Sequence, residues 1–400
     1  MLTMREKASL TTTIRMRYHR ASKTEKTIIL DEFVESCGYN RSYARRVLGQ
    51  IHPTCDGRKK KRTQVRTHQY DYAVFLPLRT CWLAAGWICG KRLHPFLPEL
   101  IPILEKNKEL KLTAPIRRKL LTMSRSTIDR MLAATKKRYA LKGRSTTKPG
   151  TLLKNQIQIR TFADWEDKKP GFFEIDGVAF CGENPQGHYV YGLNFTDVCL
   201  QWIGLEAVMG KGQFGIHEAV QRIQTRLPFP ILGIDSDNGS EFINDIMLRF
   251  CENNHITFTR IRAGRKNENC YVEQKNYTVL RNFVGYGRYE TEEQLKIIQE
   301  LLKCVEVYVN FFQPSQKLLK KVRVGSKVMK TYDQARTPYQ RLRESDMLKP
   351  NQQQTLRHVY EGLNPMDLQR NIHALQTKLM HTHRYKNDEA TNMEFRYIIT

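Results

Sequence analysis

The pattern of apolar and polar positions divides the chain into helical outer parts and a mixed central part. Residues 1–50 and 69–140 carry apolar residues at helical spacing, as do residues 291–312 and 339–378. In the centre, short apolar runs predict strands, with a helix at Phe214–Arg226; the strands are Phe172–Phe180, His188–Asn194, Gln201–Val208, Ile231–Ile234 and Ile256–Thr259. Three consecutive strands, a helix and another strand predict a mixed sheet covered by helices.

The first fifty residues have the pattern of a helix-turn-helix unit, assigned to residues 1–52. Ser22-Lys23-Thr24-Glu25 has the form of a capping box, and Gly38 suits the end of the helix that follows. A short basic helix comes next, and its residues Arg41, Ser42, Arg45 and Arg46 are candidates to face a DNA groove. The alternative is a small helical bundle with a solvated basic face.

A linker at residues 53–68 contains a dense cationic run, Arg58-Lys59-Lys60-Lys61-Arg62. Such runs contact phosphates or a minor groove. Nuclear import is the rival interpretation in a eukaryotic protein, and the sequence does not decide between them.

Residues 69–141 form a second helical unit, in which Trp82 and Trp87 are assigned to a core and Pro95, Pro98 and Pro102 punctuate the next segment. Two helices, Thr113–Leu121 and Ser126–Tyr139, resemble a second helix-turn-helix, with Arg125 and Arg130 as candidate DNA contacts. The basic loop after it belongs to a linker at residues 142–170.

Charge is distributed unevenly along the chain. The chain carries a formal net charge of +26. Residues 1–150 have 33 basic against 11 acidic residues, residues 151–310 have 17 against 21, and residues 311–400 have 16 against 8. Basic flanks around an acidic centre indicate a polyanion such as double-stranded DNA as partner, whereas a generically basic protein is the alternative.

Other features of the sequence limit the class of protein to which the chain can belong. A length of 400 residues allows two or three domains, and no run of eighteen apolar residues predicts a membrane span. The N-terminus lacks the hydrophobic region of a signal peptide, and nine cysteines are scattered without CxxC pairs. A reducing cytoplasm fits this cysteine usage best.

Three acidic residues are candidates for one metal site. Asp176 stands inside an apolar strand, where a lone carboxylate is costly unless something compensates it. Asp237 lies in the turn Ser236-Asp237-Asn238-Gly239-Ser240-Glu241-Phe242, after which a helix is expected from near Ser240. Glu273 lies on a helix expected to start near Asn267 and to continue through Phe283. Carboxylate oxygens are the ligands that Mg²⁺ prefers.

These motifs resemble the catalytic core of retroviral integrases and of the bacterial insertion-sequence transposases that share it. That family has an aspartate on the first core strand, a second in a Ser/Thr-Asp-Asn-Gly-x-x-Phe turn, and a glutamate after thirty-five intervening residues. Here thirty-five residues separate Asp237 from Glu273, and the resemblance covers residues 171–312, the expected ribonuclease H-like core. The zinc module of the retroviral proteins is absent from this sequence.

The resemblance implies a catalytic and metal-binding triad of Asp176, Asp237 and Glu273 with two Mg²⁺ (or Mn²⁺) ions. It also implies a cytoplasmic, nucleoid-associated bacterial transposase that works as a homodimer or higher multimer on DNA, without a membrane or a small-molecule substrate. Such an enzyme cuts the element ends by hydrolysis and joins the 3′ hydroxyl to target DNA. Arg265, Lys266 and Lys275 are expected to hold phosphates beside the metals, and residues 313–400 form a basic C-terminal region of unassigned role.

Each acidic residue also has an ordinary interpretation. Asp237 alone suits a helix cap, Glu273 alone suits a solvated helix surface, and Asp235 competes with Asp237 for the second metal position. Other nearby acids are assigned structural or solvated roles: Glu174, Asp197, Glu241, Asp245 and Glu268. The rival functions are a nuclease of the same fold without joining activity and a catalytically inactive DNA-binding regulator.

Overall fold

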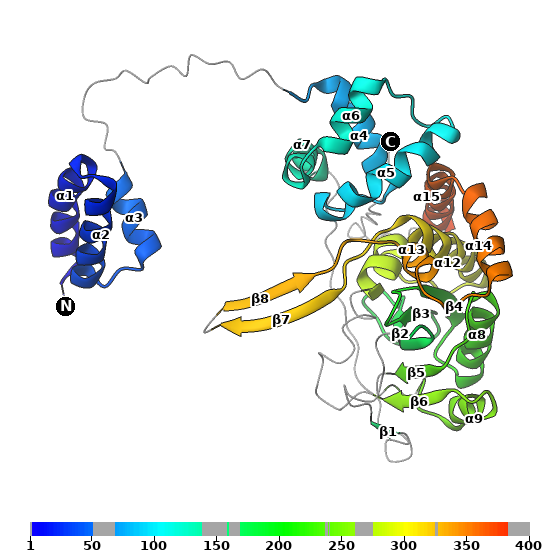
Figure 1. Cartoon of the computed structure of the whole chain (residues 1–400). Coiled ribbons are helices and arrows are strands. Elements are labelled where there is room, and N and C mark those ends of the chain that lie inside the picture. Colours follow the sequence, from blue (N-terminus) through cyan, green and yellow to red (C-terminus); the bar gives the residue numbers. More distant parts are fainter. Residues whose placement is uncertain are drawn as a thin grey trace. The chain divides into compact units, whose positions relative to one another are not determined.

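The chain forms two compact units, Met1–His68 and Gln69–Thr400. The computed structural model describes residues 2–50, 69–137, 158–159, 169–236, 239, 241–260, 275–324 and 327–382 (Figure 1). The predicted boundaries between further domains of the second unit stay predictions.

The first unit is a bundle of three helices, α1 Met4–Arg20, α2 Lys23–Cys37 and α3 Arg41–Gly49. Ser22 and Glu25 form the predicted capping box, and Gly38 ends α2 in the left-handed conformation, with φ of 64°. Buried side chains of α2 and α3 form a separate small core: Leu30, Phe33, Cys37, Ala44 and Leu48. The three helices therefore have an apolar interior of their own.

The second unit begins with four helices, α4 Tyr72–Ala84, α5 Gly90–Lys106, α6 Ala114–Thr122 and α7 Arg125–Lys137. The expectation that prolines punctuate the segment after residue 90 is wrong, because Pro95, Pro98 and Pro102 all lie within α5. Pro98 and Pro102 are exposed, whereas the opposite face of α5 is fully buried. Tertiary packing of that face thus outweighs the helix-breaking tendency of proline.

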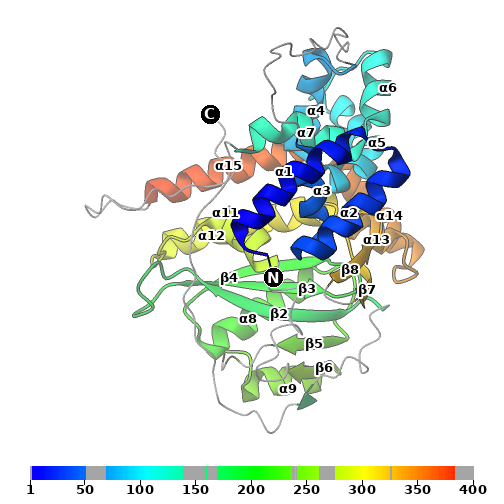
Figure 2. The same ribbon diagram turned by 90° about the vertical axis from the view of Figure 1, so that its left-hand side faces the viewer.

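The centre of the second unit is a six-stranded mixed sheet with the order β1-β6-β5-β2-β3-β4. Its strands are β1 Gln158–Ile159, β2 Phe172–Ala179, β3 Val190–Asp197, β4 Ile203–Met209, β5 Gly233–Ser236 and β6 Thr257–Arg260. β3 is antiparallel to β2 and β4, whereas β2, β5 and β6 are parallel (Figure 2). This order confirms the predicted ribonuclease H-like mixed α/β fold.

Helices cover both faces and one edge of this sheet. Helix α8, Gln213–Arg226, packs so closely on one face that a Cβ on Gly204 would lie 2.5 Å from a methyl carbon of Ile223. The π-helical turn η1, Asn276–Arg281, lies against the other face, and α11, Asn282–Val284, continues from it to contact α12. Helix α12, Glu292–Phe312, follows the edge strand β4 (Figure 2).

Side chains of α12 satisfy the backbone of β4 at the sheet edge. Asn310 accepts a hydrogen bond from the Ile203 N–H and donates one to its carbonyl, at 2.9 and 2.8 Å. Glu306 accepts from the Leu205 N–H at 2.7 Å. Because an unpaired edge invites pairing with another strand, α12 closes this side of the sheet.

Two predicted boundaries near the motif turn differ from the structure: the strand expected at Ile231–Ile234 is β5, Gly233–Ser236, and the helix expected after the turn begins later. Helix α9 spans Asp245–Asn253 and is capped by Asn244, so the expected helix start near Ser240 is wrong. Phe242 and Ile243 are buried before the helix begins, and their apolar character mimicked a helical face. The third core strand, β4, and the helix that follows it, α8, lie close to their predicted positions.

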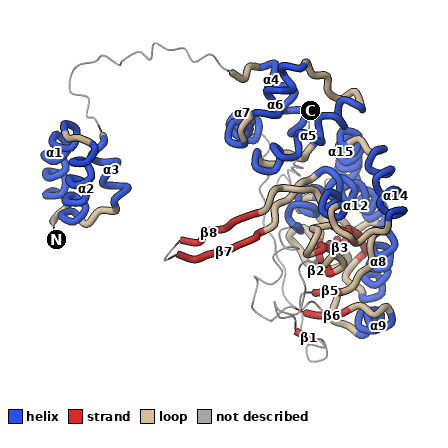
Figure 3. Tube along the Cα trace, in the orientation of Figure 1, coloured by secondary structure: helices blue, strands red, loops and turns tan. Residues whose placement is uncertain are grey.

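The last part of the chain returns to the helical part of the second unit. After α12 come a two-stranded ribbon and three helices: β7 Leu318–Val324, β8 Lys327–Tyr332, α13 Pro338–Arg343, α14 Pro350–Gly362 and α15 Pro365–Thr382 (Figure 3). Gln340 donates to Glu99 on α5 at 2.6 Å, and Arg370 forms an ion pair with Glu109. Within the described ranges, no helix is long and apolar enough to cross a membrane.

Candidate active site and nucleic-acid interface

Asp176 stands on the central strand of the sheet, on the face covered by η1. It is half-buried, and its Oδ1 accepts a hydrogen bond from the Gly177 N–H at 2.7 Å. In the antiparallel register with β3 it lies opposite Asn194. The polar residue that the sequence singled out in an apolar strand is therefore directed to the η1 side, where other polar groups gather.

The second predicted acid follows the strand next to β2. Ile175 pairs with Ser236, the last residue of β5, so Asp176 and Asp237 each come one residue after a paired position. Asp237 itself lies outside the described residues. Its competitor Asp235 is fully buried and accepts a hydrogen bond from Thr259 Oγ1 at 2.6 Å.

An asparagine that sequence reasoning did not select joins the glutamate segment to Asp176. Asn276, the first residue of η1, donates from Nδ2 to Asp176 Oδ2 at 2.6 Å. Its Oδ1 accepts from Asn194 Nδ2 at 2.9 Å. Glu273 lies outside the described residues, three positions before Asn276. That spacing, about one helical turn, is the signal in the sequence that could have pointed to Asn276.

A tyrosine assigned to packing by its sequence links β3, the strand next to that of Asp176, to the motif turn. Tyr191 Oη donates to Glu241 Oε1 at 2.7 Å, and the Lys211 ammonium lies 4.9 Å from the ring centroid of Tyr191. A Cβ on Gly177 would come within 2.1 Å of Tyr191 Oη. Gly177, next to Asp176, is thus the residue that gives Tyr191 room to reach the turn.

Beside η1 lies a cavity of about 560 Å³ between the helical part, the sheet and the start of the ribbon. Its lining includes Trp87, Arg92, Thr196, Lys275, Asn282 and Tyr332. Lys275 keeps partial solvent exposure, yet the groups crowded around its ammonium lower its pKa to about 7, chiefly by desolvation and secondarily through Arg92 and Arg341. The structure places this predicted DNA-binding lysine in the cavity wall.

The described part of the candidate metal site suits a hard divalent cation. Among the residues with described positions, no three His, Cys, Asp or Glu side chains cluster as a metal site. Two of the three predicted ligands, Asp237 and Glu273, lie outside those positions. Asp176 supplies a carboxylate held by amide donors, and oxygen donors of this type fit Mg²⁺ or Mn²⁺.

The other predicted DNA contacts fall into three groups. On α3, Arg45 and Arg46 are exposed, whereas Arg41 forms an ion pair with Asp31 and the Ser42 N–H is capped by Asn40. Arg125 and Arg130 are exposed on α7. Outside the described residues lie Arg58, Lys59, Lys60, Lys61, Arg62, Arg265 and Lys266. All of these assignments stay predictions.

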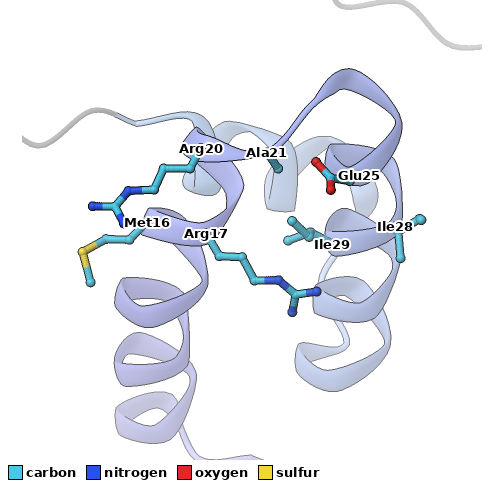
Figure 4. Close-up of a pocket in the computed structure, with 7 residues that line it drawn as sticks. All are labelled: Met16, Arg17, Arg20, Ala21, Glu25, Ile28 and Ile29. Carbon is cyan, nitrogen blue, oxygen red and sulfur yellow. The ribbon is translucent and has the colours of Figure 1, made fainter.

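The first unit also carries an open groove of about 600 Å³ between α1 and α2 (Figure 4). Its lining mixes apolar and charged side chains: Met16, Arg17, Arg20, Ala21, Glu25, Ile28 and Ile29. Arg17 also forms a 3.4 Å ion pair with the exposed Glu32. The groove contains no arrangement of groups suited to catalysis.

Comparison with known proteins gives one relative with extensive identity. The chain is 36% identical over 335 residues to the uncharacterized protein y4rM of Sinorhizobium fredii, covering 83% of this chain and 93% of the relative. No protein-family model matches the chain. Two solved structures are similar at 14% identity: the magnesium complex of the HTLV-2 integrase catalytic core, with TM-score 0.28 over 36% of this chain and 90% of the other, and the BIV integrase catalytic core, with TM-score 0.29 over 42% and 91%.

Proposed function

The chain belongs to the family of protein y4rM of Sinorhizobium fredii, and we propose that it is a DNA transposase. In this proposal it binds the ends of an insertion element, cuts them by metal-dependent phosphodiester hydrolysis and joins the 3′ hydroxyl to target DNA. Asp176, Asp237 and Glu273 are the catalytic and metal-binding residues.

One observation carries the proposal: the hydrogen bond between Asn276 and Asp176. It fixes the segment that directly follows Glu273 against the strand of the first acid. The parallel pairing of β2 with β5 ends one residue before Asp176 and Asp237. The strand of Asp176, the strand that ends at Ser236 and the segment that begins with Asn276 are thus held together, which supports a common site for the three acids.

A divalent metal held by these carboxylates would activate the attacking oxygen and stabilise the leaving oxygen of the phosphodiester. The residues of the chain provide the surroundings. Asn276 orients the Asp176 carboxylate, and the Gly177 N–H restrains its other oxygen. Tyr191, through Glu241, ties the motif turn to β3. Exposed cations of the first unit, Arg45 and Arg46, are available to position the DNA by phosphate contacts.

The test uses the full chain, Mg²⁺ or Mn²⁺, and labelled duplexes taken from the inverted repeats that flank the coding sequence in its source DNA. A supercoiled plasmid serves as target. We expect nicking at the repeat end and labelled plasmid products, both abolished by Asp176→Asn. DNA binding should be retained by that variant, because the amide keeps the shape of the side chain.

The two rival functions give different results in the same assay. Nicking without transfer of label to the plasmid would favour a nuclease of this fold. Binding of the duplexes without nicking in either metal would favour a DNA-binding regulator. Cleavage that survives Asp176→Asn would overturn the assignment of the active site.

A further inference from the structure

Strands β7 and β8 form an antiparallel ribbon that projects from the body of the second unit (Figures 1 and 3). Its register pairs Leu318 with Tyr332 at the base and Val324 with Lys327 at the far end. The two strands form a sheet of their own, separate from the central sheet. Neither strand of the ribbon pairs with a described strand of the central sheet.

The ribbon is cationic and carries exposed apolar side chains. Residues 317–332 contain six Lys or Arg and no Asp or Glu. Lys320 and Lys330 are exposed, and the register sets two lysine positions, 321 and 330, opposite each other. Leu319 and Met329 are 66% and 64% exposed, so the ribbon also presents apolar side chains to solvent.

The base of the ribbon is firmly attached to the body. Asp333 accepts from the Lys317 N–H at 2.6 Å and forms an ion pair with Arg341 at 2.7 Å, a pair whose Arg341 side chain is only 8% exposed. Lys317 Nζ donates to the Cys199 carbonyl at 2.8 Å. A projecting ribbon with a fixed base holds its bound partner in a defined position relative to the sheet.

This base lies close to the candidate active site. Tyr332, the last residue of β8, lines the same cavity as Thr196 and Lys275. Thr196 Oγ1 donates to Asn194 Oδ1 at 3.2 Å, and Asn194 is bound in turn to Asn276, the partner of Asp176. A nucleic acid bound along the ribbon would thus extend past its base to β3 and η1, close to Asp176.

We propose that the β7–β8 ribbon is a DNA-binding arm that lies along a groove of duplex DNA, with its lysines on the phosphates and its apolar side chains against sugars and base edges. A two-stranded ribbon fits the major groove in width. Charge selects DNA over a second copy of this chain, because two ribbons would bring their cations together. The proposal concerns binding and does not require catalysis.

The test compares two double variants of the full chain. Lys320→Ala/Lys330→Ala removes two exposed ribbon charges. Lys296→Ala/Lys303→Ala removes two exposed charges from α12 instead, so this control variant has the same net charge as the ribbon variant. Binding to a fluorescent duplex is measured in EDTA by anisotropy over a range of salt. We expect the ribbon variant to lose affinity and its plot of log K against log salt to become shallower by about 2, one unit for each phosphate contact.

The α12 variant should keep the slope of the unaltered protein. Equal slopes for both variants would overturn the proposal. A second copy as the partner is distinguished by light scattering: if Leu319→Ser dissociates a dimer in the absence of DNA while binding to the duplex is unchanged, the arm serves protein association and the proposal fails. Because EDTA removes catalysis from the readout, an inactive active site would leave this result intact.

Discussion

At the scale of single residues, the site depends on amide groups as much as on acids. Asn276 and Asn194 form a hydrogen-bonded row that ends on Asp176. Amide groups that donate to a carboxylate fix its rotamer without adding a positive charge that would compete with a metal cation.

Asn276 should act as a positioning residue. Asn276→Ala frees one oxygen of Asp176, and we expect about 10- to 100-fold slower cleavage together with a raised Mg²⁺ requirement, as is usual when a group that orients a metal ligand is lost. Gel assays at varied Mg²⁺ would measure both. Tyr277→Ala, one residue along and 47% exposed, is the control and should behave like the unaltered chain. An unchanged Mg²⁺ dependence in Asn276→Ala would refute the role.

Asp237, rather than Asp235, should be the second metal-binding acid. Asp235 is fully buried with Thr259 as a hydrogen-bond partner, which is a structural arrangement that an amide can preserve. We therefore expect Asp235→Asn to keep measurable cleavage and Asp237→Asn to lose cleavage and joining. Both variants need a circular dichroism check of folding. Loss of activity in a folded Asp235→Asn protein, with activity retained in Asp237→Asn, would reverse the assignment.

At the scale of elements, a buried ion network joins three of them at the sheet edge. Arg226 of α8 pairs with Glu206 of β4 at 3.0 Å and with Glu306 of α12 at 3.2 Å. Burial raises the pKa of Glu306, and Arg226 opposes that rise. Arg222, on the same helix, reaches Glu206 at 3.3 Å but is more exposed. The network holds α12 against the strand whose backbone it caps.

Removal of Arg226 should destabilise the second unit strongly. Arg226→Met leaves two buried carboxylates without their central cation, and we expect a loss of about 3–5 kcal/mol in the free energy of unfolding. Arg222→Met should cost about 0–1 kcal/mol, because its ion pair is partly solvated. Urea unfolding followed by tryptophan fluorescence reports on this unit, since every tryptophan lies beyond residue 68. Equal losses in the two variants would contradict the network.

At the scale of the whole molecule, the second unit is held together by contacts between distant parts of the chain. Tyr308 on α12 donates to the Ala84 carbonyl on α4 at 2.9 Å, and Lys106 reaches the Glu361 carbonyl. The helices of residues 72–137 thus pack with α12 and with the C-terminal helices. A fragment that ends after α7 would expose this packed surface, so binding experiments are better done with the full chain.

The pH dependence of unfolding should carry a contribution from Asp197. This side chain is fully buried, and desolvation raises its pKa to about 7, although the Leu200 and Gly171 N–H groups and Lys317 act in the opposite direction. Between about pH 4 and pH 7 the folded chain keeps a proton that the unfolded chain releases. The contribution is therefore fully present below pH 4 and is lost as pH rises through 7, at up to about 1.4 kcal/mol per pH unit.

Asp197→Asn removes this titration. The difference in unfolding free energy between the unaltered chain and the variant should fall with rising pH from about 4 to 7 and then become constant. Denaturant unfolding at a series of pH values measures it. Parallel profiles for the two proteins would show that Asp197 is already ionised in the folded state.

The sequence by itself determined the succession of elements and the fold class. Capping boxes, the left-handed Gly38 and the apolar runs of the central strands act locally, so their outcome can be inferred from neighbouring residues. It also singled out Asp176, because a carboxylate in an apolar strand requires a compensating partner whatever the surroundings. The motif spacing that selected Asp237 and Glu273 is likewise a property of the sequence alone.

Only the tertiary structure decided which distant residues meet. Nothing in the sequence around Tyr191 distinguishes a packing tyrosine from one that binds Glu241, since fifty residues separate them. The three prolines of α5 are tolerated because the opposite face of that helix is buried, which a local pattern cannot reveal. Asn276 meets Asp176 because β2 and η1 pack face to face. Such contacts depend on how elements pack, and packing energy is summed over the whole unit rather than encoded at single positions.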